Sequence, residues 1–144
     1  MRWGHTTLIL QLIEDERIIF QIPLSPIDWS SEELVHDLAA FEANFARYSK
    51  LFTALSNETR LMMMKQLIQK KNQTINFTEF MRELNLNPKI VWENTKKLRE
   101  GGLLIKVGRG SYRCSELGEN SFMIMNLAFR KLLQVLEETK KLKR

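Results

Sequence analysis

Two runs of alternating apolar and polar residues lie near the start of the chain. An acidic segment, Glu14-Asp15-Glu16, separates these runs, so together they predict a β-hairpin over residues 6–22. Pro23 and Pro26 are expected to end the hairpin, because proline cannot donate a hydrogen bond to a neighbouring strand. The alternating apolar residues are Leu8, Leu10 and Leu12 in the first run and Ile18, Phe20 and Ile22 in the second.

After the hairpin, apolar residues recur every three or four positions, which predicts amphipathic helices. The first helix is expected over residues 30–50, with Ser30 or Ser31 as its N-cap. A second helix is expected to begin at Ser56 or Asn57. Each helix would bury one apolar stripe and expose its polar face to solvent.

A shorter helix is predicted over residues 78–84, followed by a tight turn and a helix over residues 88–100. Pro88 suits the first position of that last helix, where the missing backbone N–H costs nothing. Gly101 and Gly102 then provide a helix-ending signal.

Two short strands are predicted over residues 103–107 and 111–114, around a Gly108-Arg109-Gly110 reversal. A helix-turn-helix followed by such a hairpin is a winged helix-turn-helix. The final predicted helix, residues 117–142, is apolar on more than one face. Such a helix needs a partner on two sides, which favours a homodimer.

The expected fold is therefore mainly α with a small amount of β (α+β), built around a winged helix-turn-helix core. Residues 1–29 would form an N-terminal β-hairpin extension, and residues 30–144 would form the winged-helix domain. Within that domain, residues 30–50 and the long C-terminal helix, residues 117–143, would flank the core as dimerisation helices.

Composition excludes several classes of protein. The 144 residues include a single cysteine, so neither an intramolecular disulfide nor a cysteine-cluster metal site is expected. No apolar run approaches the roughly 20 residues that cross a bilayer. The short run over residues 8–13 leads into acidic residues without a cleavage site, so a cytoplasmic location is expected. No phosphate-binding loop or catalytic triad pattern is present, which argues against an enzyme.

The formal net charge of +5 is unevenly distributed. Residues 1–55 carry 4 basic and 8 acidic side chains, whereas residues 56–115 carry 12 basic and 5 acidic ones. The positive charge therefore coincides with the predicted winged helix, which suggests a polyanionic partner. The alternative is a basic face that only contacts solvent.

Candidate contact residues lie on the helix over 88–100 and on the wing. Val91, Thr95 and Leu98 share one face of the helix and should pack inward, leaving a polar and basic outer face. In a winged helix this second helix enters the DNA major groove, and the wing reaches phosphates or the minor groove. The candidate DNA-binding residues are Asn87, Lys89, Trp92, Glu93, Lys96, Lys97, Lys106, Arg109 and Arg113.

Three segments resemble the winged helix of ArsR-type transcriptional regulators. They read LFTALSNETRL at residues 51–61, KKLREGGLL at residues 96–104 and GRGSYR at residues 108–113. The resemblance covers about residues 34–143. It implies a dimeric DNA-binding repressor or activator, of which we expect a repressor. The two-fold symmetry of a homodimer then predicts a pseudo-palindromic site in double-stranded DNA.

The chain departs from the metal-sensing members of that family. Their paired cysteines in the short helix are replaced here by Thr78-Glu79-Phe80-Met81, and the last helix has no histidine. His5 and His36 have no neighbours at ligand spacing. We therefore expect no metal and no other cofactor, and the sequence identifies no effector.

The recognition helix also departs from the small polar pattern common in the family, because it reads KIVWEN at residues 89–94. Glu93 could accept a hydrogen bond from a cytosine amino group. Trp92 could stack against DNA or, equally, take a half-buried packing role. These two residues support an alternative function, a winged-helix protein-protein interaction module that has lost specific DNA reading.

Two single residues have competing interpretations. Arg60, near the start of its helix, could contact a phosphate or pair with a carboxylate of its own subunit, and the sequence favours neither. Cys114 could be a redox sensor, but a lone cysteine in a strand is more often a small apolar filler. We therefore interpret Cys114 as a packing residue.

Overall fold

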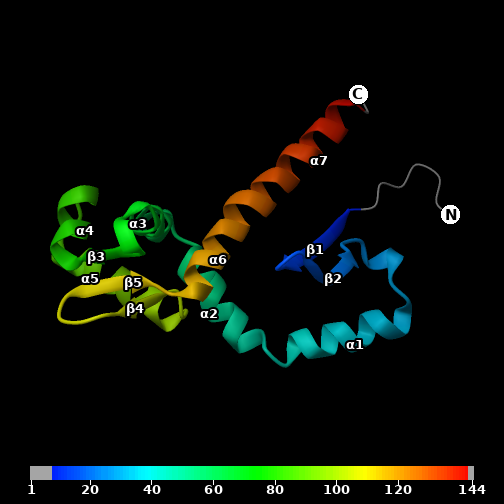
Figure 1. Ribbon diagram of the computed structural model, residues 1–144, viewed down its shortest axis with the longest axis horizontal. Coiled ribbons are helices and arrows are strands. Elements are labelled where there is room, and N and C mark those ends of the chain that lie inside the picture. Colours follow the sequence, from blue (N-terminus) through cyan, green and yellow to red (C-terminus); the bar gives the residue numbers. More distant parts are fainter. Residues whose placement is uncertain (1–7, 143–144) are drawn as a thin grey trace. The chain divides into compact units, whose positions relative to one another are not determined.

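The structure is a computed structural model that describes residues 8–142 (Figure 1). His5, the first two residues of the predicted hairpin and residue 143 of the predicted last helix lie outside this range. The chain divides between Phe45 and Ala46 into two compact units, which we describe separately. No helix within residues 8–142 combines the length and the apolar character that a membrane crossing requires.

The first unit contains the predicted hairpin. Strand β1 (Ile9–Glu14) pairs antiparallel with β2 (Arg17–Pro23), and the register shifts between Leu12 and Ile13. Asp15 and Glu16 both have positive φ, of 48° and 65°, as a two-residue hairpin turn requires. A single 3-10 turn, η1 (Pro26–Asp28), follows, and the Trp29 indole donates a 2.8 Å hydrogen bond to the Pro23 carbonyl. The predicted hairpin is confirmed over its described residues.

The single helix predicted over residues 30–50 is wrong, because the structure has two helices there. Helix α1 (Ser31–Glu42) is capped by Ser30, and helix α2 (Phe45–Leu55) begins after a break. At the break, the Asn44 backbone N–H donates to Phe41 O at 3.0 Å and its side-chain amide donates to Ala40 O at 3.2 Å. Both donors of Asn44 thus turn back onto α1, which ends the helix.

The second unit contains the winged helix-turn-helix. Helices α3 (Glu58–Gln69), α4 (Phe77–Leu84) and α5 (Pro88–Glu100) follow one another, drawn in green in Figure 1. A three-stranded antiparallel sheet in the order β3-β5-β4 completes it, and its two wing strands are β4 (Leu104–Lys106) and β5 (Ser111–Cys114). The expected α+β winged-helix fold is confirmed.

Strand β3 (Thr74–Asn76) lies between α3 and α4, where no strand was predicted. It follows a short 3-10 segment, η2 (Lys71–Gln73). Its three residues are too few to show an alternating pattern, and pairing with β5 defines the strand, with Ile75 opposite Tyr112. Ile75 is buried, so this strand closes one side of the core.

The core lies between these helices and the sheet. Asn76 caps α4 through a reciprocal capping box with Glu79, and Asn87 caps α5 just before Pro88. These caps satisfy backbone N–H groups at the helix starts, which lets the apolar faces pack together. The fully buried side chains include Met63, Met64, Leu67, Ile75, Phe80, Val91, Leu98 and Leu103.

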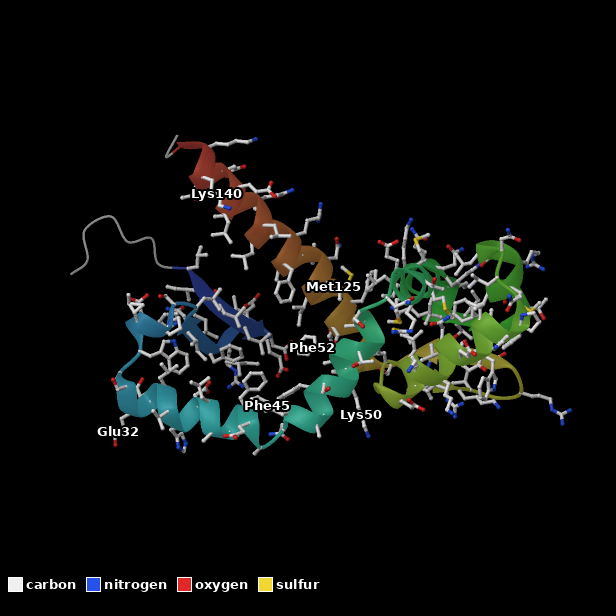
Figure 2. The ribbon with its side chains drawn as sticks, turned by 180° about the vertical axis from the view of Figure 1, so that it is seen from behind. Glu32, Phe45, Lys50, Phe52, Met125 and Lys140 are labelled. Carbon is white, nitrogen blue, oxygen red and sulfur yellow. The ribbon has the colours of Figure 1, made fainter. Side chains whose placement is uncertain are left out.

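The last predicted helix contains an irregularity. Helix α6 (Glu116–Ile124) continues through a π-helical segment, η3 (Met125–Phe129), into α7 (Arg130–Leu142). A π-helical turn holds one more residue than an α-helical turn, so it changes the direction in which later side chains point. Figure 2 marks Met125 at the start of this segment and Lys140 in α7.

Candidate nucleic-acid interface

Helix α5 has one buried and one exposed face, as predicted. Val91, Thr95 and Leu98 are buried in the core. Asn87 lies at the amino-terminal end, where its side-chain oxygen accepts a 2.9 Å hydrogen bond from the Ile90 N–H. The Asn87 oxygen is therefore used for capping, and the exposed end of α5 around it has the partial positive charge of a helix N-terminus.

Four of the predicted site residues meet on the exposed face of α5. The ammonium of Lys89 lies 3.9 Å from a Glu93 carboxylate oxygen, and that of Lys96 lies 5.2 Å from the centroid of the Trp92 ring. Trp92 is 57% exposed, so the half-buried packing role considered from the sequence is wrong. This face combines an apolar ring, a carboxylate and two ammonium groups.

A surface hollow of about 580 Å³ separates the carboxyl-terminal half of α5 from strand β4. Lys96 and Lys106, both predicted from the sequence, line this hollow together with Arg99 and the carboxylate of Glu100. Arg99 was not among the predicted site residues, although its position one turn after Lys96 on a basic helix could have predicted that the two side chains lie on the same face. The recognition helix and the wing thus present three cations around one concave surface.

Lys97 lies on a different side of α5. It lines a smaller hollow between α5 and α2, together with Lys50 and Glu100. Lys50 of α2, labelled in Figure 2, was also missed, because no sequence pattern relates residue 50 to residue 97. The structure therefore does not group Lys97 with the cations beside the wing.

The wing has an exposed tip. Gly108 and Gly110 have φ of +119° and +70°, values that favour glycine, and the exposed Arg109 lies between them. Nothing approaches within 4 Å of where a Cβ would lie on either glycine. Arg113 is exposed on β5, opposite Ile105 of β4 and Thr74 of β3.

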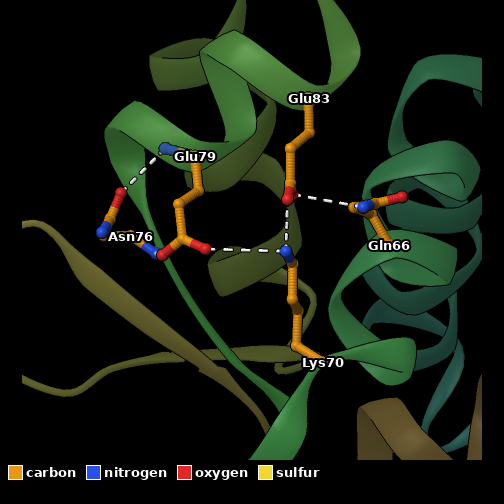
Figure 3. A network of polar contacts seen from close by, with 5 residues as sticks. All are labelled: Gln66, Lys70, Asn76, Glu79 and Glu83. Atoms are coloured by element: carbon orange, nitrogen blue, oxygen red, sulfur yellow. Dashed lines mark hydrogen bonds and ion pairs between the residues drawn. The ribbon is translucent and has the colours of Figure 1, made fainter.

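A polar network holds α4 against the end of α3 (Figure 3). Lys70 forms an ion pair with Glu83 and lies 3.6 Å from Glu79, and Gln66 donates a 3.2 Å hydrogen bond to Glu83. The hydrogen bond with Lys70 lowers the pKa of Glu83, and the same bond raises the pKa of Lys70. The first helix of the helix-turn-helix is thereby fixed by charge as well as by packing.

Both sequence-based interpretations of Arg60 are wrong. The side chain is 7% exposed, so it is too buried to contact a phosphate. Its guanidinium donates to Thr53 O, Ala54 O and Asn94 Oδ1, each at 2.8 Å, so its partners are neutral oxygens rather than a carboxylate. The role of Asn94, a buried residue of α5, was not foreseen.

Cys114 is a buried packing residue, as interpreted from the sequence. Burial, with a smaller contribution from Glu119, raises the pKa of its thiol to about 11. Because the thiolate is the reactive form, this environment disfavours oxidation. Within residues 8–142, no three histidine, cysteine or carboxylate side chains are placed to hold a metal ion.

Two solved structures resemble the chain distantly. No family model and no curated protein matches the chain. Among solved structures, a MarR family transcriptional regulator from Streptomyces coelicolor is 11% identical, over 79% of this chain and 94% of its own, with a TM-score of 0.46. The YusO protein from Bacillus subtilis is 16% identical, over 80% and 98%, with a TM-score of 0.43. Function is therefore argued from the residues of this chain alone.

Proposed function

We propose that this protein is a transcriptional regulator that binds double-stranded DNA as a homodimer. The observation that carries the proposal is the hollow between α5 and the wing, where Lys96, Arg99 and Lys106 converge on a winged helix-turn-helix. A convex recognition helix beside such a basic hollow fits a major groove and its adjacent phosphates.

The predicted site residues have distinct roles in this proposal. Lys96, Lys97, Lys106, Arg109 and Arg113 would contact phosphates, with Arg109 at the wing tip also able to enter the minor groove. Glu93 would accept from a cytosine amino group, and Lys89 would limit its repulsion of phosphates. Trp92 would contact a thymine methyl group or a sugar, and Asn87 would orient the helix end toward a phosphate.

The homodimer is proposed from exposed apolar residues on the helices that flank the core. Phe129, Leu133 and Leu136 follow one another at helical spacing from the π-helical segment into α7, and they are 54%, 60% and 47% exposed. Phe52 on α2, labelled in Figure 2, is 57% exposed. Apolar stripes of this kind mark protein interfaces. We assign them to a second copy, with residues 30–50 and 117–143 in the interface as predicted.

Two-fold symmetry would place two recognition helices on half-sites roughly 34–36 Å apart, in a pseudo-palindromic operator. The ArsR type and repression as the mode of action rest on the resemblance in sequence. Residues 1–29 would add a β-hairpin extension to this domain.

The test is the salt dependence of binding to random duplex DNA. The variant Lys96→Ala/Lys106→Ala/Arg109→Ala should bind more weakly, and the slope of log affinity against log salt should fall by about 0.9 for each phosphate that is no longer neutralised. The control Arg17→Ala/Lys65→Ala/Lys71→Ala removes three exposed cations that lie outside both the proposed contact residues and the proposed interface. It changes the net charge equally and should keep the slope.

Selection of bound sequences from a random library should then enrich an inverted repeat. A wild-type protein that fails to bind duplex DNA at low salt would contradict the proposal. That result would favour the alternative, a protein-interaction module that uses the exposed Trp92.

A further inference from the structure

The buried side chain of Arg60 has a charge but no charged partner among its three hydrogen-bond acceptors. Two of these acceptors, Thr53 O and Ala54 O, belong to the last turn of α2. Carbonyls at a helix C-terminus lack intrahelical donors and have a partial negative charge. The guanidinium donates to Ala54 O and shares Thr53 O with the hydroxyl of Ser56, which donates to it at 2.9 Å. The partial negative charge at this helix end offsets part of the cost of burying the cation.

The third acceptor connects this arrangement to the recognition helix. Asn94 Oδ1 accepts from Arg60, and Asn94 Nδ2 donates to Ile90 O, both at 2.8 Å. Asn94 is 8% exposed, so neither its oxygen nor its amide can reach a base or a phosphate. Any influence of Asn94 on DNA binding must therefore act through the position of α5.

A second point of contact lies at the end of α5. A Cβ added to Gly101 would lie 2.7 Å from Ala54 Cβ, closer than such atoms pack, and 3.2 Å from Lys50 O, which is a tight contact. Gly101 thus allows the end of α5 to touch α2 directly. Asn94 and Gly101 are seven residues apart, about 10 Å along a helix axis. Two fixed points at that spacing define the direction of the helix.

We propose that Arg60, Asn94 and Gly101 are positioning residues that fix the axis of the recognition helix against the carboxyl-terminal half of α2. The inference rests on the proposed function, since it makes the orientation of α5 on DNA depend on α2. Arginine is required because its planar guanidinium donates in several fixed directions, whereas a lysine ammonium at residue 60 could not reach all three oxygens.

The experiment compares DNA affinity with the free energy of unfolding for the full chain. Asn94→Ala removes the link between α2 and α5, and Arg60→Lys keeps the charge but loses the fixed geometry. Thr95→Ala is the matched control, because Thr95 is the next residue of α5 and is also buried, but its hydroxyl donates to Trp92 O within its own helix. Gly101→Ala tests the second contact point.

We expect the folded fraction of Asn94→Ala and of Arg60→Lys to bind duplex DNA about tenfold more weakly than wild type. Gly101→Ala should weaken binding similarly, and Thr95→Ala should change affinity less than about threefold at a comparable loss of stability. Equal affinities for Asn94→Ala and Thr95→Ala would overturn the inference. If Arg60→Lys does not fold, the affinities of Asn94→Ala and Gly101→Ala, compared with that of Thr95→Ala, test the positioning role.

Amide hydrogen exchange without DNA separates this inference from the proposed function. In Asn94→Ala, exchange should accelerate in α5 and in the last turn of α2 more than in α4. In Thr95→Ala, it should follow the loss of global stability. If wild type does not bind DNA but this exchange pattern appears, the positioning contact stands and the DNA-binding proposal fails. If both variants show the same pattern, the positioning role is wrong.

Discussion

The winged-helix core and the segments on either side of it use the same apolar residue types but bury them to different extents. Every buried apolar side chain of the described chain lies between Ala54 and Cys114. In contrast, none of the described residues up to Phe45 is buried, and Leu133 of α7 is 60% exposed. The core therefore closes on itself, whereas the apolar side chains of the flanking segments are not enclosed in it.

This difference shows what a hydrophobic period does and does not encode. A three- or four-residue repeat identifies which helix face avoids water, but it does not identify what covers that face. In α5 the repeat faces the rest of the same chain, and in α7 it faces outward. The buried apolar face of α5 stabilises the fold of one chain, whereas the exposed apolar face of α7 is the basis of the proposed homodimer.

Truncating one phenylalanine in each region should give the largest contrast. Phe80 is fully buried, so Phe80→Ala should lower the free energy of unfolding by about 3–5 kcal/mol. Phe41 of α1 is 45% exposed, and Phe41→Ala should cost less than about 1 kcal/mol. Urea unfolding at low protein concentration measures both values. Similar losses would mean that α1 belongs to a closed core.

Negative charges introduced on α7 test whether its exposed apolar residues form the proposed interface. Leu133→Glu/Leu136→Glu should convert the proposed homodimer to monomer, because two carboxylates would have to be desolvated in the interface. The winged helix should still unfold cooperatively, since neither side chain belongs to its core. Sedimentation equilibrium provides the measurement, and Gln134→Glu, an exposed position on the same helix, is the control. An unchanged mass for the double variant would exclude α7 from the interface.

The sequence was most informative where local signals determine structure. Pro88 and the Gly101-Gly102 pair define the ends of α5, and the glycines beside Arg109 define the wing, so most candidate contacts could be named in advance. Strand β3 could not be predicted, because its partner β5 is distant in sequence. The break at Asn44 depends on side-chain hydrogen bonds that compete with the helix.

The sequence was least informative about the contacts of Arg60, because three separate helices contribute to its environment. Its acceptors lie in α2 and α5, and the nearest in sequence, Ala54, is six residues away. From the sequence, Arg60 is a charged residue near the start of a helix, and such a side chain is usually exposed to solvent. Only the packed arrangement brings a helix end and an asparagine together around the guanidinium.

The smallest effect is expected from the Lys70–Glu83 ion pair at the surface of the core. Removing this pair tests whether packing alone stabilises the winged helix. Lys70 lowers the pKa of Glu83 from its ordinary value of 4.5, so the pair stabilises the fold above that pH and this contribution is lost as pH falls through the lowered pKa. The pKa of Lys70 is raised from 10.5, so its contribution is present below that pH and is lost as pH rises through the raised value.

Glu83→Gln should therefore lower stability near neutral pH and flatten its decline in acid, whereas Glu100→Gln, at an exposed position of α5, should keep the wild-type profile. Thermal unfolding between neutral pH and pH about 3 gives both curves. Added salt should reduce the difference between wild type and Glu83→Gln, because a partly exposed pair is screened. If the two glutamine variants show the same profile, the ion pair contributes nothing, and the buried apolar side chains alone distinguish the core from its flanks.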